Sequence, residues 1–309
     1  MDIPHIPVLF DEVIDSFKDV DDGYFVDCTL GYGGHSSGVL QRYPNLKHIG
    51  IDRDDEALEF SKQRLKAFED RSVLYKGSFS QVLPKLTQQP IVALLADFGV
   101  SSLQLDKKSR GFAFDSDVLD MRMDSSASLS AYEVVNEYSK DKLEYILHNY
   151  GEVKAYRKIA SAIVSKRVQH PIKSAKELSD IVVSISPKGG KIHPATLVFQ
   201  AIRIEVNDEL GEIERLLDAI EQRHFEGEVV SLITFHSLED RLVKNRFKKW
   251  SKDCICDDNA MRCECGKNHA LGKLITRKPI VASKDEIKLN PRSRSAKLRV
   301  FRFDKGLKG

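Results

Sequence analysis

The sequence predicts an α/β fold with a doubly wound, mainly parallel sheet. Three apolar segments each end in an aspartate, over Tyr24–Asp27, Leu46–Asp52 and Ile91–Asp97. A glycine-rich turn, Gly31–Gly34, follows the first of them. The third is almost continuously apolar, as expected for a central parallel strand buried on both faces. Strand, glycine turn and helix in this order are typical of a nucleotide-type cofactor fold, although a plain turn between strand and helix gives the same pattern.

The glycine turn and the second aspartate together indicate the kind of cofactor. The backbone amides that open the helix expected over Ser36–Tyr43 favour a bound anion or carboxylate. Asp52 follows Gly31 at about the spacing at which an acid accepts hydrogen bonds from a ribose diol. The turn reads G-x-G-G and lacks the third glycine of the dinucleotide pattern. This favours a cofactor with one ribose and no pyrophosphate, such as S-adenosylmethionine, over a dehydrogenase cofactor.

Other candidate site residues also follow expected strands. Phe79 comes after the strand predicted over Ser72–Tyr75 and could stack on an adenine or pack in the core. Asp97 lies at the tip of the fourth strand, where open α/β sheets carry their chemistry. His236 follows the apolar segment Glu228–Phe235 and fits either an active-site position or a helix cap.

The middle of the chain interrupts the α/β alternation. Apolar residues recur at helical spacing in several consecutive segments, which predicts an inserted helical subdomain over residues 115–211. Residues 1–114 and 212–309 then form one discontinuous α/β domain. The expected helices of the insertion lie over Ser130–Asn136, Lys140–Tyr150, Val153–Gln169, Ser174–Ile185 and His193–Ala219. In the α/β part, further helices are expected near Val13–Phe17, over Asp54–Phe68 and near Val243–Trp250, and late strands over Gly272–Thr276 and Lys297–Phe303.

Composition and charge limit the function classes. The 309 residues are 41% hydrophobic and 30% charged, which is typical of a soluble globular protein. The sequence contains neither a signal-peptide pattern nor an apolar run long enough to span a membrane, so we expect a cytoplasmic protein without membrane contact. Residues 241–309 hold 20 Lys/Arg and 7 Asp/Glu (net +13), whereas residues 1–240 hold 28 and 39 (net −11). The basic C-terminal part suggests a polyanionic partner, most simply a nucleic acid.

Four of the five cysteines form two C-x-C pairs separated by six residues. They are Cys254, Cys256, Cys263 and Cys265. Such a cluster in a reducing compartment can close a tetrahedral thiolate site for a structural zinc ion. The alternative is a surface loop with reduced, unliganded thiols.

Taken together, these stretches resemble the bacterial 16S rRNA cytosine-N4 methyltransferases, the MraW (RsmH) family. The segments that carry the resemblance are His5–Leu9, Asp27–Ser36, Asp97–Asp106, Arg110–Phe112, Asp120–Asp124, Arg203–Asn207, Phe235–Asp240 and Asn290–Ser295. They follow one another over almost the whole chain.

The resemblance implies a class I, Rossmann-like S-adenosylmethionine-dependent methyltransferase with an inserted helical substrate-recognition domain. Its implied cofactor contacts are Gly33, Gly34, His35, Asp52, Phe79, Asp97 and Gln104. The implied substrate is a cytosine in the decoding region of 16S rRNA, within the small (30S) ribosomal subunit.

A mechanism follows as a hypothesis. Asp97, or the backbone carbonyls after it, would accept hydrogen bonds from the cytosine amine, and His236 or solvent would receive the proton. Two other functions remain open: a DNA amino-methyltransferase, and a ribosome assembly factor without turnover. The residues after Asp97 are Phe98-Gly99-Val100, so the Pro-Pro-aromatic motif of related amino-methyltransferases is absent.

Overall fold

The computed structural model describes residues 7–100, 105, 107–186, 193–223, 227–257 and 262–304. The chain divides into two compact units. One combines Met1–Gly99 with Glu212–Gly309, and the other is Val100–Gly211. The second unit therefore begins at Val100, whereas the sequence analysis placed the start of the insertion at Asp115. It ends at Gly211, as the sequence analysis placed it.

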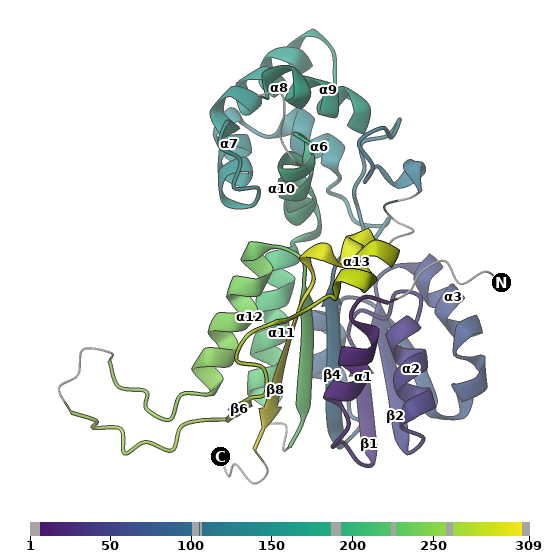
Figure 1. The fold of residues 1–309 in the computed structure, drawn as a ribbon. Coiled ribbons are helices and arrows are strands. Elements are labelled where there is room, and N and C mark those ends of the chain that lie inside the picture. Colours follow the sequence, from purple (N-terminus) through teal and green to yellow (C-terminus); the bar gives the residue numbers. More distant parts are fainter. Residues whose placement is uncertain are drawn as a thin grey trace. The chain divides into compact units, whose positions relative to one another are not determined.

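The first unit contains one sheet, which confirms the expected doubly wound α/β architecture. Its strands are β1 (Gly23–Asp27), β2 (Leu46–Asp52), β3 (Ser72–Lys76), β4 (Ile91–Phe98), β5 (Val229–Thr234), β6 (Gly272–Leu274), β7 (Ile280–Val281) and β8 (Lys297–Phe303). Their order in the described chain is β3-β2-β1-β4-β5-β8-β6, and β7 also pairs with β8 (Figure 1). Strands β1 to β5 are parallel to one another. Strand β8 runs antiparallel to β5 and β6.

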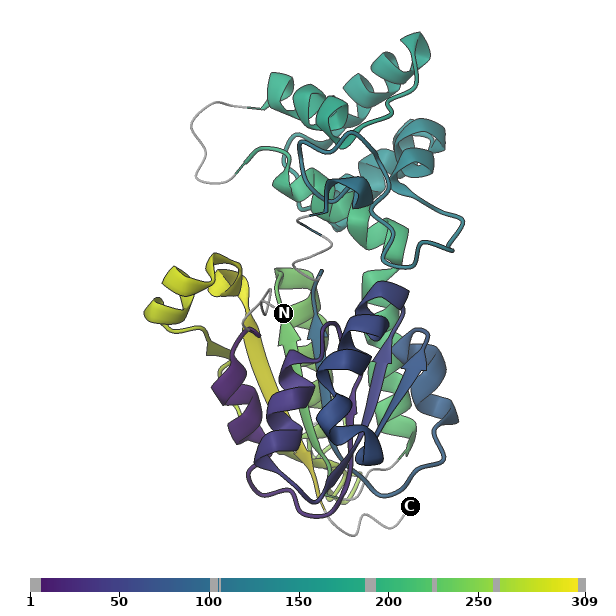
Figure 2. The same cartoon turned by 90° about the vertical axis from the view of Figure 1, so that its right-hand side faces the viewer.

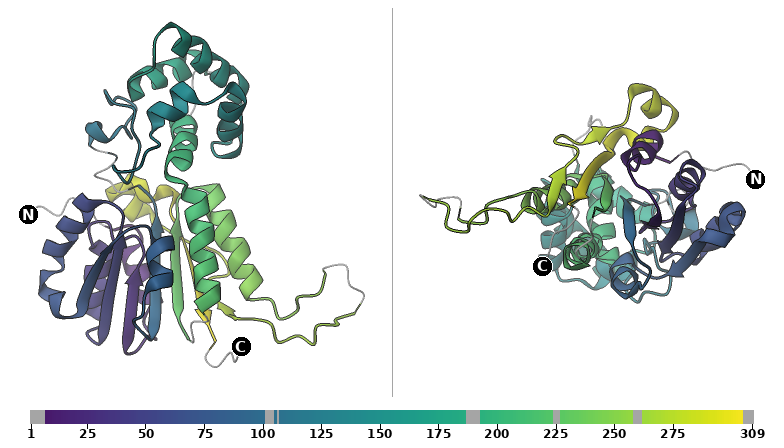
Figure 3. Two further views of the ribbon diagram at one scale, coloured as in Figure 1. Left: turned by 180° about the vertical axis from the view of Figure 1, so that it is seen from behind. Right: turned by 90° about the horizontal axis from the view of Figure 1, so that it is seen from below.

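Helices cover both faces of this sheet. They are α1 (Phe10–Ser16), α2 (Gly34–Arg42), α3 (Asp55–Arg64), α4 (Phe79–Val82), α11 (Glu209–Arg223), α12 (Ser237–Trp250) and α13 (Lys284–Leu289). Helices α1 and α2 lie on one face of the sheet (Figure 2), and their side chains share a buried cluster with Phe25, Ala93 and Leu95 of the strands. Helices α4, α11 and α12 lie on the other face (Figure 3), and their side chains share a second buried cluster with Val26 and Leu94. Successive strand residues thus point to opposite faces, which is why these strands read as continuous apolar runs.

The end of the chain completes the sheet. Trp250, the single tryptophan, is buried among Phe247, Phe301 and Phe303, with ring centroids 5.2–5.4 Å from that of the indole. This aromatic cluster fastens α12 to β8. Strand β7 and helix α13 were not expected from the sequence, because two apolar residues and a six-residue helix leave too short a periodic pattern.

The second unit is helical in its described part. It contains α6 (Ala131–Glu137), α7 (Lys140–Asn149), α8 (Tyr156–Gln169), α9 (Ala175–Ile185) and α10 (Thr196–Asn207). Ser130 and Ser174 begin α6 and α9 with capping boxes. The single helical segment expected over His193–Ala219 is wrong: α10 ends at Asn207, and Asp208 adopts a left-handed conformation with φ 48° before α11 begins. No helix in the described residues is long and apolar enough to cross a membrane.

Candidate active site at the carboxyl ends of the strands

The glycine turn after β1 has a backbone that only glycine adopts readily. Gly31 and Gly33 have φ values of 50° and 67°. Gly33 is the N-cap residue of α2, and no side chain caps this helix. A Cβ atom on Gly34 would lie 2.5 Å from Cγ of Pro7, so the chain can pass here only without a side chain. The first amides of α2 are therefore available to an anionic ligand group.

Asp52, at the end of β2, is built into this turn. Its Oδ2 accepts a hydrogen bond from the Gly31 amide at 2.7 Å, and its Oδ1 accepts one from the Asp54 amide at 2.9 Å. Burial raises the pKa of Asp52. Each carboxylate oxygen can still accept a further bond, as a ribose diol requires. The predicted ribose acid and the glycine turn thus form one hydrogen-bonded substructure.

Asp27, at the end of β1, begins a buried polar chain that the sequence analysis missed. Its Oδ2 accepts a bond from Ser36 Oγ at 2.6 Å, and Ser36 Oγ lies 2.9 Å from His48 Nε2. His48 Nδ1 lies 2.7 Å from Ser72 Oγ. Burial raises the pKa of Asp27 to about 6 and lowers that of His48 to about 3. His48 is therefore neutral, and the chain ties β1, α2, β2 and β3 together below the site.

The carboxyl group of Asp97 has fewer hydrogen-bond partners among the described residues than those of Asp27 and Asp52. Its backbone amide donates to Thr29 Oγ1 at 2.6 Å, which joins the tip of β4 to the turn after β1. Its Oδ1 is buried and has no hydrogen-bond partner among the described residues. Burial, reinforced by the nearby carboxylates of Asp27 and Glu239, raises the pKa of Asp97 to about 8. A cation or a hydrogen-bond donor placed beside this carboxyl would relieve its unfavourable environment.

His236 lies at the N-cap position of α12. Its Nδ1 lies 3.5 Å from the amide nitrogen of Glu239, and its Nε2 lies 3.1 Å from Glu239 Oε1. Glu239 Oε2 in turn accepts a bond from the Phe235 amide at 2.7 Å. The imidazole is therefore held by its own helix, which corresponds to the capping alternative for this residue. This geometry does not test its predicted role as proton acceptor.

The remaining predicted cofactor residues are placed differently. The side chain of His35 is buried, and its Nε2 bonds the carbonyl oxygen of Val8 at 2.9 Å. Phe79 is buried in the core beside Phe98, with ring centroids 6.1 Å apart, which fits the packing alternative. Gln104 lies outside the described residues.

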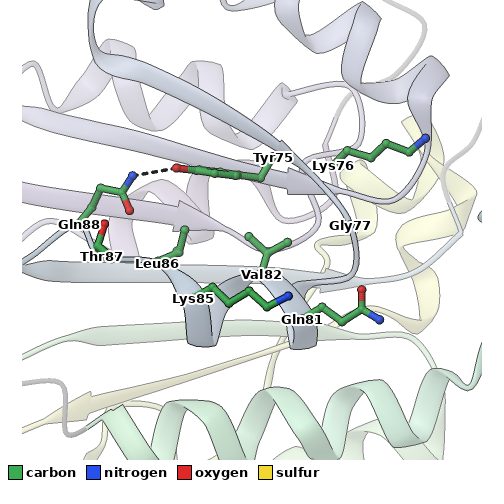
Figure 4. A pocket seen from close by; sticks show the side chains of 9 residues that line it. All are labelled: Tyr75, Lys76, Gly77, Gln81, Val82, Lys85, Leu86, Thr87 and Gln88. Atoms are coloured by element: carbon green, nitrogen blue, oxygen red, sulfur yellow. Dashed lines mark hydrogen bonds between the residues drawn. The ribbon is translucent and has the colours of Figure 1, made fainter.

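The structure contains a cavity of about 250 Å³ that none of these acids lines (Figure 4). It is lined by Tyr75, Lys76, Gly77, Gln81, Val82, Lys85, Leu86, Thr87 and Gln88. The Gly77 amide bonds the backbone carbonyl of Asp52 at 2.9 Å, so its rim adjoins the predicted ribose site. The four late cysteines lie together elsewhere, between α12 and β6, with their sulfur atoms all within 4.8 Å of one another.

These residues fit S-adenosylmethionine. The uncapped start of α2 suits its carboxylate, Asp52 suits its ribose, and the acids around Asp97 suit its positively charged groups. The carboxylates of Asp27 and Glu239 lie near enough to raise the pKa of Asp97, so a positively charged ligand group would meet charges of opposite sign there. The fold and the site define a class I S-adenosylmethionine-dependent methyltransferase.

The chain belongs to the MraW methylase family, whose model matches residues 2–304. It is 72% identical over 303 residues to the ribosomal RNA small subunit methyltransferase H of Sulfurovum sp. (strain NBC37-1), covering 98% of this chain and 99% of that protein. It is 59% identical to the protein of the same name from Aliarcobacter butzleri (strain RM4018), covering 98% and 100%. Among solved structures, precorrin-6y C5,15-methyltransferase from Geobacter metallireducens GS-15 aligns with a TM-score of 0.43 and 8% identity, covering 96% and 88%.

The raised pKa of Asp97 predicts how folding stability depends on pH. Between about pH 4, where an unfolded aspartate titrates, and about pH 8, the folded protein holds a proton that the unfolded chain releases. Stability from this group is therefore lost as the pH rises through that window. We expect Asp97→Asn to melt a few degrees above the unsubstituted protein at about pH 8.5, and the difference to vanish near about pH 4.

Thermal melts without cofactor, followed by circular dichroism across this range, measure the effect. Asp55→Asn is the control, because Asp55 is an exposed acid paired with Lys76. A melting difference for Asp97→Asn that is the same at every pH would contradict the assigned titration.

Proposed function

We propose that this chain transfers the methyl group of S-adenosylmethionine to the exocyclic N4 of a cytosine in the decoding region of 16S rRNA, within the small (30S) ribosomal subunit. The observation that carries the proposal is the buried Asp97 carboxyl at the tip of β4, whose Oδ1 has no partner among the described residues. Membership of the MraW methylase family and the names of the relatives support the RNA substrate.

The cofactor would be held by groups that the sheet brings to one edge. The amides at Gly34 and His35 would bind its carboxylate, and Asp52 would bind its ribose hydroxyls. The side chains of Asp52 and Ser61 bond the backbone of Gly31, and Arg64 bonds the carbonyl oxygen of Tyr32, so the turn is held in place. When bound, S-adenosylmethionine supplies an electrophilic methyl group on a sulfonium. The rigid turn contributes alignment, which accounts for much of the rate in such transfers.

Asp97 would act on the amine that receives the methyl group. The lone pair of the cytosine N4 is delocalised into the ring, so the amine is a poor nucleophile. A hydrogen bond from N4 to the Asp97 carboxylate would favour a pyramidal nitrogen with an available lone pair. A carboxylate with a pKa near the working pH is also well suited to accept a proton. His236 remains a proposed second acceptor, with solvent as the alternative.

The substrate would be a cytosine turned out of its stack, because the acids at the strand tips cannot reach a paired base. The basic residues of 241–309, among them exposed arginines such as Arg294, would bind the RNA backbone. The helical unit, Val100–Gly211, would recognise the RNA around the target. The reaction would take place in the cytoplasm, on assembled 30S subunits.

The test is a methylation assay with labelled S-adenosylmethionine and 30S subunits from a strain that lacks this methylation. The rRNA is digested to nucleosides and analysed by mass spectrometry. N4-methylated cytidine supports the proposal. Cofactor binding with no methylated nucleoside on any substrate would support a non-catalytic assembly factor. Methylation of duplex DNA in preference to 30S subunits would instead support a DNA amino-methyltransferase.

The assigned role of Asp97 predicts a pH-dependent rate. The kcat/KM for S-adenosylmethionine should rise about tenfold per pH unit below about pH 8 and level off above it, since it reports the free enzyme. The inflection in kcat should lie at lower pH, because a bound cation favours the ionised carboxyl. In Asp97→Asn, kcat/KM should no longer rise with pH, and the rate of methyl transfer should fall about 10²–10³-fold. Transfer by Asp97→Ala near the unsubstituted rate would exclude the acceptor role.

The assigned role of Asp52 predicts a ribose-specific loss of affinity. Calorimetry with S-adenosylhomocysteine should show binding weakened about 10–100-fold in Asp52→Ala, as for one or two hydrogen bonds to a charged group. The unsubstituted protein should bind the 2′-deoxy form of this ligand more weakly than S-adenosylhomocysteine itself. The Asp52→Ala variant should bind the two forms with nearly equal affinity. Asp55→Asn should change neither. A preference for the ribose that survives in Asp52→Ala would place the diol elsewhere.

A further inference from the structure

The segment between the end of α12 at Trp250 and the start of β6 at Gly272 has no hydrophobic core of its own in its described part. Figure 1 shows its described arms as a long excursion: residues 251–257 lead away from the end of α12, and residues 262–271 lead back to β6. Among its described residues, 251–257 and 262–271, none is buried. Ile255, its one large aliphatic side chain before the return to Leu271, is 64% exposed. Hydrophobic burial therefore cannot hold the two arms of this excursion together.

Backbone pairing fixes only the base of the excursion. The Leu271 amide donates to the Trp250 carbonyl at 2.7 Å, and the His269 amide donates to the Asp253 carbonyl at 3.1 Å. Immediately beyond these bonds, each arm carries one C-x-C pair. The cysteines thus lie where a cross-link between the arms would extend the pairing.

The four sulfur atoms have the spacing of a tetrahedral metal site. Cys254, Cys263 and Cys265 have Sγ atoms that are all 3.6 Å apart, and the Sγ of Cys256 lies within 4.8 Å of each of them. Four sulfurs at about 2.3 Å from a central zinc ion lie about 3.8 Å from one another. A disulfide would need about 2.05 Å between two of them.

Backbone amides are also directed at this cluster. The amides of Glu264 and Cys265 donate to Cys256 Sγ at 3.2 and 3.3 Å. Such N–H donors stabilise a thiolate, the form that ligates metal. The chain then turns sharply after Cys265, through positive φ values at Gly266, Lys267 and Asn268. The turn lets the arm close around the cluster and continue to β6.

His269 completes the outer shell and is not itself a ligand. Its Nε2 lies 2.9 Å from the carbonyl oxygen of Cys265. This contact fixes the backbone next to a ligand position. The donor set is therefore four cysteines, and the soft thiolate ligands favour zinc over harder cations such as magnesium or calcium.

We propose that Cys254, Cys256, Cys263 and Cys265 bind one Zn²⁺ ion in a closed, structural site that joins the two arms of the excursion. Four protein ligands leave no position for water, so the ion has no part in methyl transfer. Binding releases the thiol protons and supplies the stabilisation that this coreless segment lacks.

The test is metal analysis of the full-length protein, purified with a thiol reductant and without chelator. We expect about one zinc per chain by plasma mass spectrometry, and four sulfur neighbours at about 2.3 Å by X-ray absorption. The double variant Cys254→Ser/Cys265→Ser should retain less than about 0.1 zinc per chain, because two of the four ligands are gone. Cys28→Ala is the matched control, since Cys28 is buried in the core and should leave the zinc content unchanged.

Cobalt and proteolysis make the test independent of the folding of any variant. The reduced, metal-free protein should develop thiolate-to-cobalt absorption when it is titrated with Co²⁺, and Zn²⁺ should remove it. Zinc should also protect the excursion from a protease, relative to the chelated protein. The proposal is overturned if the purified protein contains iron, or if it contains no metal and Co²⁺ gives no thiolate band. It is also overturned if the double variant keeps its zinc, or if two of these cysteines form a disulfide under reducing conditions.

Discussion

The free-energy cost of a buried carboxyl group governs the architecture of this site. Asp27 and Asp52 end two strands of a parallel sheet and Asp97 is the last residue but one of a third, and the sheet brings all three to one edge. Two of them are satisfied internally, by Ser36 and by the amides of Gly31 and Asp54. Asp97 is not, and an unsatisfied buried polar group costs about 1–3 kcal/mol. The site is thus preorganised for a partner that brings positive charge or an N–H group.

The same constraint explains why the supporting interactions are polar. Thr29 connects the turn after β1 to the amide of Asp97, and Ser61 bonds the carbonyl of Gly31. Below them, the buried chain through Ser36 and His48 adds side-chain hydrogen bonds to the backbone pairing of β1, β2 and β3. Each of these groups is itself bonded, so the positions of the acids are defined by directional contacts. A ligand that needs several groups at fixed positions benefits from this rigidity, because little ordering remains for the binding step.

The sequence predicted the strands well and the side-chain networks poorly, for physical reasons. The runs ending at Asp27, Asp52 and Asp97 are apolar because both faces of a covered parallel sheet are buried, so the residue pattern reports the strands directly. The contact of Ser36 with His48 leaves no such pattern, since its partners are twelve residues apart on different elements. The break at Asp208 was missed because a single left-handed aspartate interrupts a helix without glycine or proline. Phe79 could not be assigned, because an aromatic residue that stacks on a base and one that packs in the core look alike in sequence.

Apolar burial stabilises the two folded units of this chain but not the excursion that carries the cysteines. A bound metal would therefore add the most stability in that excursion. The α/β unit buries aliphatic and aromatic side chains on both faces of its sheet, and the helical unit has its own apolar cluster. Of the described residues of the excursion that follows Trp250, only Leu271, at its return to β6, packs against one of these clusters, and it is partly buried. A chain segment that buries little apolar surface gains little free energy to offset its conformational entropy, so a cross-link stabilises it effectively. The cysteine pairs occur in this excursion alone, whereas the fifth cysteine, Cys28, packs in the core as a small apolar side chain. The four clustered thiols therefore lie where the described chain buries little apolar surface, and the fifth lies inside the core.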